Sequence, residues 1–217
     1  MSKIVTVDGL SATGKSTLVK SLAKELGFTG FSSGTLFRIF ALLALQQGLE
    51  PDNVKALVPI FENLDFKQQT INGEDRIFVA GQDVTRAIQS NEIALYASRT
   101  HGYTEIRNIF FDKLTEFTQN RNLVLDGRSL GARYFHDADR KIVLESNLEQ
   151  RAKRRSLQLG KPIGETYKYL KEIDKELLNS NWHAGLPLGA LIIDTTNRTA
   201  EQVLETSLQF CSHIIEK

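Results

Sequence analysis

A complete phosphate-binding motif stands near the start of the chain. Residues 9–16 match the pattern G-x-x-x-x-G-K-[ST], with Gly9, Gly14, Lys15 and Ser16 at its fixed positions. The two glycines let the backbone turn so that successive N–H groups, and the positive end of a following helix, face one anion. The lysine reaches the β- and γ-phosphates, and the serine hydroxyl holds Mg²⁺. The motif predicts a nucleoside triphosphate site made of Gly9, Leu10, Ser11, Ala12, Thr13, Gly14, Lys15, Ser16 and Thr17.

A carboxylate and an arginine follow a second apolar run. Residues 123–125 are apolar, Asp126 ends the run, and Arg128 comes two residues later. A carboxylate at the end of a strand could hold a water on Mg²⁺ beside the phosphate loop, and Arg128 would point into the same cleft. The alternative for Asp126 is an ordinary turn residue.

Other arginines are candidates for binding phosphate groups. Arg38 is the only charged residue between Glu25 and Glu50, and burying its guanidinium without a partner would cost several kcal/mol. Either a bound anion satisfies Arg38 or its side chain reaches solvent from the edge of a helix. Further on, three arginines share one face of a predicted helix, for which a solvated surface is the simpler interpretation: Arg151, Arg154 and Arg155.

The elements around these residues predict an α/β fold. A β-branched run over residues 4–7 precedes the phosphate loop, and apolar residues at helical spacing over 15–26 follow it, up to Gly27. Further strands are expected at 28–31, 122–126, 140–145 and 190–194, alternating with helices. This order is typical of a parallel sheet that binds its ligand at the carboxyl ends of the strands.

Two regions depart from the simple alternation. After a helix to about residue 47, a short helix from Pro51 and a hairpin over 66–71 and 76–80 predict an insert at about 48–90, followed by helices over 84–99 and 103–118. Ser146 with Glu149 predicts a capping box for a helix that ends at Gly160, and a helical stretch over 165–179 follows. Thr199 with Gln202 is expected to cap the last helix.

Composition limits the possible partners. The chain has 217 residues, 41% of them hydrophobic, and a formal net charge of +1, which does not favour a uniformly basic nucleic-acid-binding surface. It has one cysteine, no apolar run near eighteen residues and no signal-peptide pattern. We therefore expect one domain over residues 1–217, in a cytoplasmic monomer without nucleic-acid or membrane partners.

Taken together, these residues resemble the bacterial-type cytidylate kinases, which are P-loop nucleoside monophosphate kinases. The resemblance runs nearly from end to end of the chain. It rests on Asp8-Gly9-Leu10-Ser11 with the loop, Ser33-Gly34 followed by Arg38, Gly81-Gln82-Asp83-Val84-Thr85, Ala97-Ser98 nine residues before Arg107, and Asp126-Gly127-Arg128.

The resemblance implies a P-loop kinase fold in which helices flank the parallel sheet, the insert with its hairpin binds the substrate, and a helical lid over about 147–180 closes on ATP. The implied reaction phosphorylates CMP or dCMP to the diphosphate in pyrimidine nucleotide metabolism, with ATP and Mg²⁺. The implied catalytic residues are Lys15, Asp126 and Arg128, with Ser16 and Asp126 at the metal and Arg154 and Arg155 at ATP. The implied substrate residues are Ser33 and Ser98 for the base and Arg38, Arg107 and Arg128 for the phosphate.

The chain departs from the family pattern at two places. Ser129 stands where the family has an acidic residue that helps to read the cytosine amino group, so we place Ser129 in the substrate site. No arginine occurs between Arg155 and Arg198, where the family carries an Arg–Asp-rich segment. The matching positions are Glu176, Ser180 and His183, and the lysines that could take over are Lys168, Lys171 and Lys175.

These departures keep other functions open. One is a kinase with a different monophosphate preference, such as UMP. Another is a kinase for a small alcohol, which the arginines Arg38, Arg107 and Arg128 disfavour. The third is a relative that binds nucleotide without catalysis, which the missing arginines favour and the intact loop disfavours.

Overall fold

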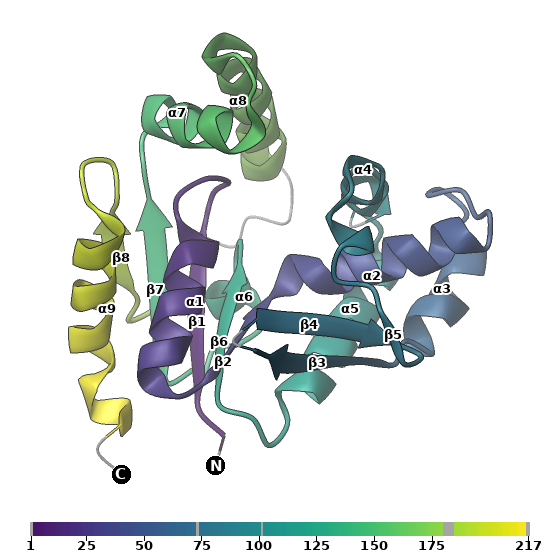
Figure 1. Cartoon of the computed structure of the whole chain (residues 1–217), viewed down its shortest axis with the longest axis horizontal. Helices are drawn as coiled ribbons and strands as arrows, with labels where there is room; N and C mark the ends of the chain where they lie inside the picture. Colours follow the sequence, from purple (N-terminus) through teal and green to yellow (C-terminus); the bar gives the residue numbers. More distant parts are fainter. Residues whose placement is uncertain (1, 73, 101, 180–184, 216–217) are drawn as a thin grey trace. The chain divides into compact units, whose positions relative to one another are not determined.

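The computed structural model describes residues 2–72, 74–100, 102–179 and 185–215, without the side chains of residues 91, 176–179 and 215. The chain divides into two compact units. We call residues 1–32 and 120–217 the sheet unit, and residues 33–119 the inserted unit. The element labels and their order along the chain are shown in Figure 1.

The sheet unit is built on five parallel strands in the order β2-β6-β1-β7-β8. This arrangement confirms the predicted parallel sheet. In the central strand Val5 and Val7 are fully buried, and Val7 lies opposite Asp126 on one side and Ile142 on the other. The strands are β1 (Ile4–Gly9), β2 (Thr29–Ser32), β6 (Leu123–Gly127), β7 (Arg140–Glu145) and β8 (Leu191–Asp194).

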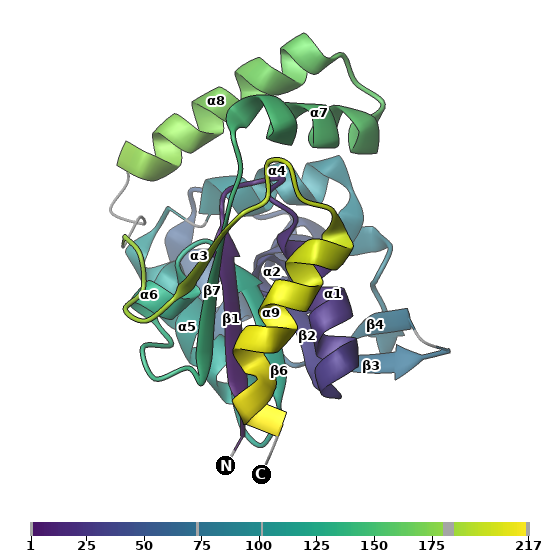
Figure 2. The same ribbon diagram turned by 90° about the vertical axis from the view of Figure 1, so that its left-hand side faces the viewer.

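Helices α1 (Lys15–Leu26) and α9 (Ala200–Ile215) pack against each other beside this sheet (Figures 1 and 2). As predicted, α1 ends at Gly27, whose φ of 68° lies in the left-handed region, and its N–H bonds back to Lys24 and Ala23. Thr199 and Gln202 form the predicted capping box of α9, with bonds of 3.0 and 3.3 Å. A short helix that the sequence analysis did not foresee, α6 (Leu130–Arg133), packs on β1.

Helices α7 (Leu148–Leu159) and α8 (Ile163–Asn179) pack together as a hairpin of the sheet unit (Figure 2). The predicted capping box at Ser146 is wrong by one residue. Asn147 is the N-cap of α7, and its side chain accepts a 2.8 Å hydrogen bond from Gln150 N. The reason is tertiary: Thr196 Oγ1 accepts from Asn147 N at 3.1 Å, which keeps the chain extended past Ser146.

The inserted unit packs four helices with a small antiparallel sheet. Its interior is aromatic: Phe37 stacks on Phe110 at 4.3 Å and Phe40 on Phe61 at 4.4 Å between ring centroids. The helices are α2 (Ser33–Gln46), α3 (Val54–Glu62), α4 (Asn91–Thr100) and α5 (Thr104–Thr118). The strands are β3 (Phe66–Ile71), β4 (Glu74–Val79) and β5 (Gln82–Asp83), and β3 with β4 forms the predicted hairpin.

The helix predicted over residues 84–99 is wrong in its first half. After β5 ends at Asp83, the chain forms a 3₁₀ turn, η1 (Ala87–Gln89), and α4 begins only at Asn91. Contacts with β4 account for the difference: Ile77 N donates to Thr85 Oγ1 at 2.9 Å, and Val84 N donates to Ile77 O at 2.8 Å. Because these bonds hold residues 84–85 beside a strand, the helical spacing there cannot form a helix.

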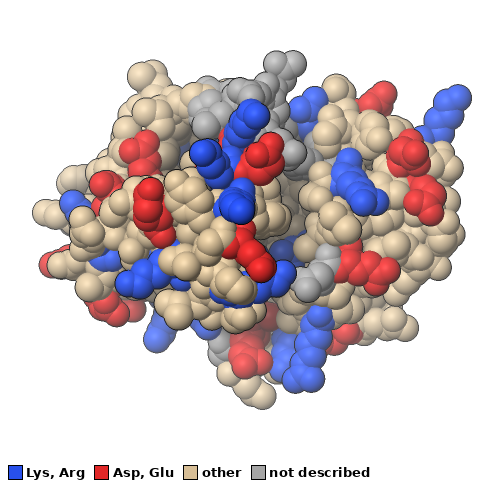
Figure 3. Space-filling view, turned by 90° about the horizontal axis from the view of Figure 1, so that it is seen from above, with Lys and Arg blue, Asp and Glu red and all other residues tan. Residues whose placement is uncertain are grey.

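Two further observations concern the hydropathy of the helices and the distribution of charge on the surface. Within the described part of the chain, no helix combines the length and the hydropathy that crossing a bilayer needs. Figure 3 shows positive and negative side chains interspersed on one face of the molecule.

Candidate active site

The phosphate loop connects β1 to α1, and its backbone has the strained conformation that the motif requires. Gly9 has a φ of 150°, and a Cβ there would lie 2.4 Å from the carbonyl oxygen of Leu144. Gly14, with a φ of 104°, precedes the first residue of α1, where no described side chain forms a cap. The first N–H groups of α1 are therefore available to an anion.

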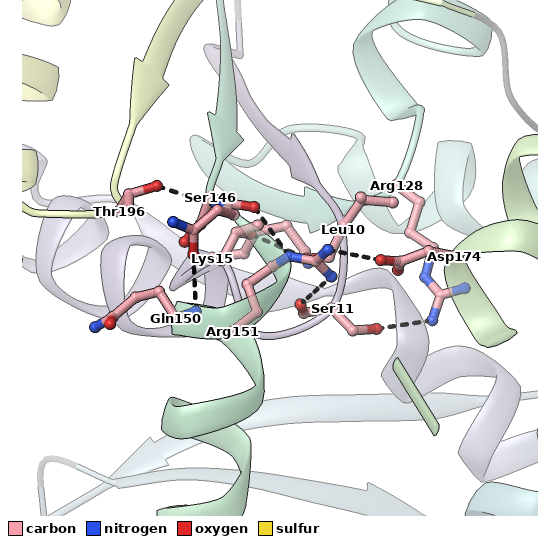
Figure 4. Close-up of polar contacts among 11 residues, drawn as sticks. Leu10, Ser11, Lys15, Arg128, Ser146, Gln150, Arg151, Asp174 and Thr196 are labelled. Carbon is pink, nitrogen blue, oxygen red and sulfur yellow. Dashed lines mark hydrogen bonds and ion pairs between the residues drawn. The ribbon is translucent and has the colours of Figure 1, made fainter. Parts of the chain in front are cut away.

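The side chain of Lys15 bonds back to the backbone of this loop. Its ammonium group donates to Leu10 O at 2.9 Å (Figure 4). Burial lowers the pKa of Lys15 to about 8, Asp126 opposes this effect, and the positive charge of Arg128 adds to it. The lysine therefore remains mostly charged at pH 7, in a position to meet phosphate oxygens.

Asp126, the second-last residue of β6, lies beside Ser16, the other residue predicted to hold a metal. It is buried and accepts hydrogen bonds from Ser32 Oγ at 2.8 Å and from Ser16 Oγ at 3.2 Å. It is part of a strand, so the interpretation as a turn residue is wrong. Within the described residues, no cluster of three or more His, Cys, Asp or Glu side chains could hold a metal ion. The hydroxyl of Ser16 and the carboxylate suit Mg²⁺, which takes few protein ligands and completes its shell with water and phosphates.

Asp8 fixes the turn that carries Arg128. Its carboxylate, 3% exposed, accepts from Leu130 N at 2.7 Å and Gly131 N at 2.8 Å. Burial raises the pKa of Asp8, against the opposing effects of these two donors and of Lys15. From this turn the half-buried Arg128 donates to Ser11 Oγ at 3.2 Å, and burial lowers its pKa. The turn therefore delivers the predicted arginine to the phosphate loop.

Ser129 belongs to the same turn and is buried. Its hydroxyl donates to Arg128 O at 2.7 Å, so the proton of this hydroxyl is engaged. The residue lines a pocket of about 760 Å³ in the sheet unit, whose lining also includes Asp8, Arg128, Ser146 and Thr196.

Arg154 of helix α7 is linked to the phosphate loop through Thr195. Arg154 Nη1 donates to Thr195 Oγ1 at 3.0 Å, and this hydroxyl donates to Thr13 O at 2.9 Å. Burial lowers the pKa of Arg154. Arg155 bonds instead to Gln158 of its own helix at 3.3 Å. Of the two arginines predicted at ATP, Arg154 is thus connected to the loop through Thr195, whereas the bond of Arg155 stays within α7.

Arg151 is a residue whose importance the sequence analysis missed. The solvated face expected for it is wrong, because Arg151 is 4% exposed. It donates to Ser146 O at 3.0 Å and to Ser11 O at 3.4 Å, and it pairs with Asp174 of α8 at 2.6 Å. One sequence signal could have indicated this pair. Asp174 is a carboxylate four residues after Leu170 and eight after Thr166, on the face of α8 that is buried.

The remaining predicted substrate residues belong to the inserted unit. Arg38 donates to Ile88 O at 3.2 Å and to the Gln89 side chain at 2.9 Å, so its guanidinium is held inside that unit. The other three residues are described by their place in a helix or by a local contact. Ser33 begins α2, the exposed Ser98 donates to Leu95 O at 2.7 Å, and Arg107 donates to Thr104 Oγ1 at 3.0 Å.

The candidate replacements for the missing arginines are exposed on α8: Lys168, Lys171 and Lys175. Ser180, His183 and the side chain of Glu176 lie outside the described residues.

Known proteins are similar to this chain over nearly its whole length. A family model described as "Cytidylate kinase" matches residues 5–213. The cytidylate kinase of Edwardsiella ictaluri is 36% identical over 211 residues, covering 94% of each chain. That of Aeromonas salmonicida is 35% identical over 216 residues, covering 97% of this chain and 94% of the other.

Solved structures show similarity of fold. A gluconokinase from Sinorhizobium meliloti gives a TM-score of 0.53 at 12% identity, covering 99% of this chain and 94% of the other. A sugar kinase from Janibacter gives 0.54 at 14% identity, covering 99% and 97%.

Proposed function

The chain belongs to the cytidylate kinase family, and from this premise we propose that it transfers a phosphoryl group from ATP to CMP or dCMP, producing ADP and the diphosphate. The chain is a nucleoside monophosphate kinase by family and by its full-length relatives. The observation that supports the proposal best is the cluster at the carboxyl ends of β1 and β6. There Lys15 lies under the phosphate loop, Ser16 contacts Asp126, and Arg128 contacts Ser11.

The chemistry requires positioning and charge neutralisation more than proton transfer. The acceptor oxygen of a nucleoside monophosphate is already anionic near neutral pH, so no general base is needed. That oxygen forms a bond to the γ-phosphorus, and the bond from this phosphorus to the β–γ bridging oxygen breaks, so that ADP leaves with the electron pair. Lys15 stabilises the charge that gathers on the transferring group and on the leaving oxygen.

Arg128 holds the acceptor phosphate against the repulsion between the two anions. A guanidinium presents two parallel N–H groups to a phosphate, which fixes its direction better than an ammonium can. The two backbone bonds to Asp8 support this role, because they fix the turn from which Arg128 extends.

Ser16 and Asp126 would hold Mg²⁺, which would neutralise the β- and γ-phosphates when bound. Ser32 orients the carboxylate of Asp126 through its 2.8 Å bond. This ligand set leaves the remaining positions of the ion to water and to the nucleotide.

We extend the proposal to the nucleotide contacts that the family resemblance implies. In the inserted unit, Arg38 and Arg107 bind the phosphate of the monophosphate, and Ser33 and Ser98 contact its base. In the sheet unit, Ser129 contacts the base, and Arg154 and Arg155 bind ATP.

A coupled assay of ADP release tests the function. We expect Mg·ATP with CMP or dCMP to give the fastest release among the common ribo- and deoxyribonucleoside monophosphates, with UMP slower. If no monophosphate raises ADP release above the rate with ATP alone, the protein is not a kinase of this type.

A further inference from the structure

A buried carboxylate on α8 pairs with an arginine that contacts the phosphate loop. Thr166, Leu170 and Asp174 form the buried stripe of this helix, with Asp174 8% exposed. Asp174 Oδ2 lies 2.6 Å from the guanidinium of Arg151, while Oδ1 is buried and accepts no hydrogen bond within the described residues. Burial lowers the pKa of Arg128, and the charge of Asp174 opposes this effect, so the carboxylate also acts on this second arginine. Asp174 is therefore a counter-ion for both Arg151 and Arg128.

Both arginines meet the phosphate loop at one residue. Arg151 donates to the carbonyl oxygen of Ser11, and Arg128 donates to its hydroxyl (Figure 4). Arg151 also holds the carbonyl of Ser146, where β7 leads into α7. One guanidinium thus connects three segments: the phosphate loop, the start of α7, and α8 through Asp174.

We propose that Asp174 is a positioning residue for ATP binding, which holds Arg151 against Ser11 so that the phosphate loop keeps its shape before the nucleotide arrives. The physical reason is repulsion: Arg151, Arg128 and Lys15 gather around one loop, and a buried guanidinium without a counter-charge is unstable. A loop that is already ordered loses less conformational freedom when it binds its ligand. In this way α8, which has no arginine, still contributes to the nucleotide site.

The test is ATP affinity, measured by calorimetry without any monophosphate. Asp174→Asn removes the charge and keeps the size of the side chain. We expect the Kd for ATP to rise about tenfold, equivalent to about 1.4 kcal/mol. Glu172→Gln, at an exposed position of the same helix, is the matched control and should leave the Kd unchanged. A folded Asp174→Asn protein with unchanged ATP affinity overturns the proposal, and tighter binding does so as well, because it would mean that the carboxylate competes with phosphate.

A second pair of variants separates positioning from general stability. If Asp174 acts through Arg151, adding Asp174→Asn to Arg151→Ala should change the Kd less than twofold further, whereas additive losses contradict the proposal. If Asp174→Asn does not fold, Asp174→Glu replaces it, and the retained charge should keep the Kd within threefold of the native value. A larger loss in a folded Asp174→Glu protein counts against the proposal.

The inference deepens the proposed function and rests on it for the identity of the nucleotide. Its readout is ATP binding, which needs no acceptor. Wild-type protein that fails to phosphorylate CMP but shows the Asp174 effect would therefore refute the function and keep the inference.

Discussion

At the scale of single residues, Lys15 has a charge that changes within an accessible pH range. Its pKa is about 8 in the free protein because of burial, and bound phosphates raise that pKa again. ATP binding above pH 8 must therefore take up a proton. We expect ATP affinity to fall as the pH rises from 8 to 9, by at most tenfold per pH unit. Calorimetric titrations at several pH values measure this slope.

Lys15→Met is the control for that slope, because methionine has a similar length and no proton to lose. The variant should bind ATP weakly, with little pH dependence over the same range, and should not transfer phosphoryl groups. An equal slope in the native and Lys15→Met proteins would assign the pH dependence to another group.

The prediction on base specificity concerns Ser129. Its proton is engaged with Arg128 O, so the hydroxyl can offer only lone pairs to a ligand. An acceptor attracts the cytosine amino group and repels the carbonyl that uracil has there. Ser129→Asp, a stronger acceptor, should raise the CMP over UMP ratio of kcat/KM about tenfold, equivalent to roughly 1.4 kcal/mol. Ser129→Ala should lower the ratio.

The two substrates are compared in one steady-state assay with both variants. An unchanged ratio in an active Ser129→Asp protein would mean that this side chain does not face the base. The specificity would then lie with other residues, of which Ser33 and Ser98 are the proposed ones.

At the scale of elements, the start of α7 offers two adjacent residues that could cap the helix, Ser146 and Asn147. Asn147 accepts the capping bond, whereas Ser146 Oγ is buried and has no hydrogen-bond partner within the described residues. Asn147→Ala should lower the free energy of unfolding by about 1 kcal/mol, and Ser146→Ala should leave it unchanged or raise it. Urea denaturation of the two variants measures the difference. The opposite order would restore Ser146 as the cap.

At the scale of the whole molecule, the proposed contacts are divided between the two units. Arg128 lies in the sheet unit with the phosphate loop, and Arg38 lies in the inserted unit. Arg38→Ala should raise the KM for CMP at least tenfold without changing the Kd for ATP.

Arg128→Ala should lower kcat at least a hundredfold with ATP affinity within threefold of the native value.

Steady-state kinetics combined with ATP calorimetry check both expectations. Equal losses of ATP affinity and of rate in Arg128→Ala would give this arginine a structural role. If the Arg38→Ala protein has the native KM for CMP, Arg38 does not bind the phosphate of the monophosphate.

Much of this architecture followed from local patterns. The glycines of the loop, the β-branched runs and the helical spacings predicted β1, the loop, α1 and the parallel sheet, because these depend on neighbours along the chain. The strand over residues 140–145 agrees residue for residue with β7, and the hairpin of β3 and β4 was expected from its turn residues. The roles predicted for Lys15 and Ser16 also came from the loop motif, without any tertiary information.

Contacts between distant segments decided the rest. Asp8 meets Leu130 and Gly131 more than 120 residues away, and Arg151 meets Asp174 across two helices. Spacing along the chain does not encode such pairs, because they form only when the sheet order and the helix hairpin exist. Tertiary contacts also decided between competing local patterns. The bond between Asn147 N and Thr196 Oγ1 favours Asn147 over Ser146 as the cap of α7. The bonds between β4 and residues 84–85 prevent those residues from forming a helix. The sequence by itself therefore determined the phosphate loop and its family, whereas only the tertiary structure decided which side chains support that loop, because support depends on burial and distance in three dimensions.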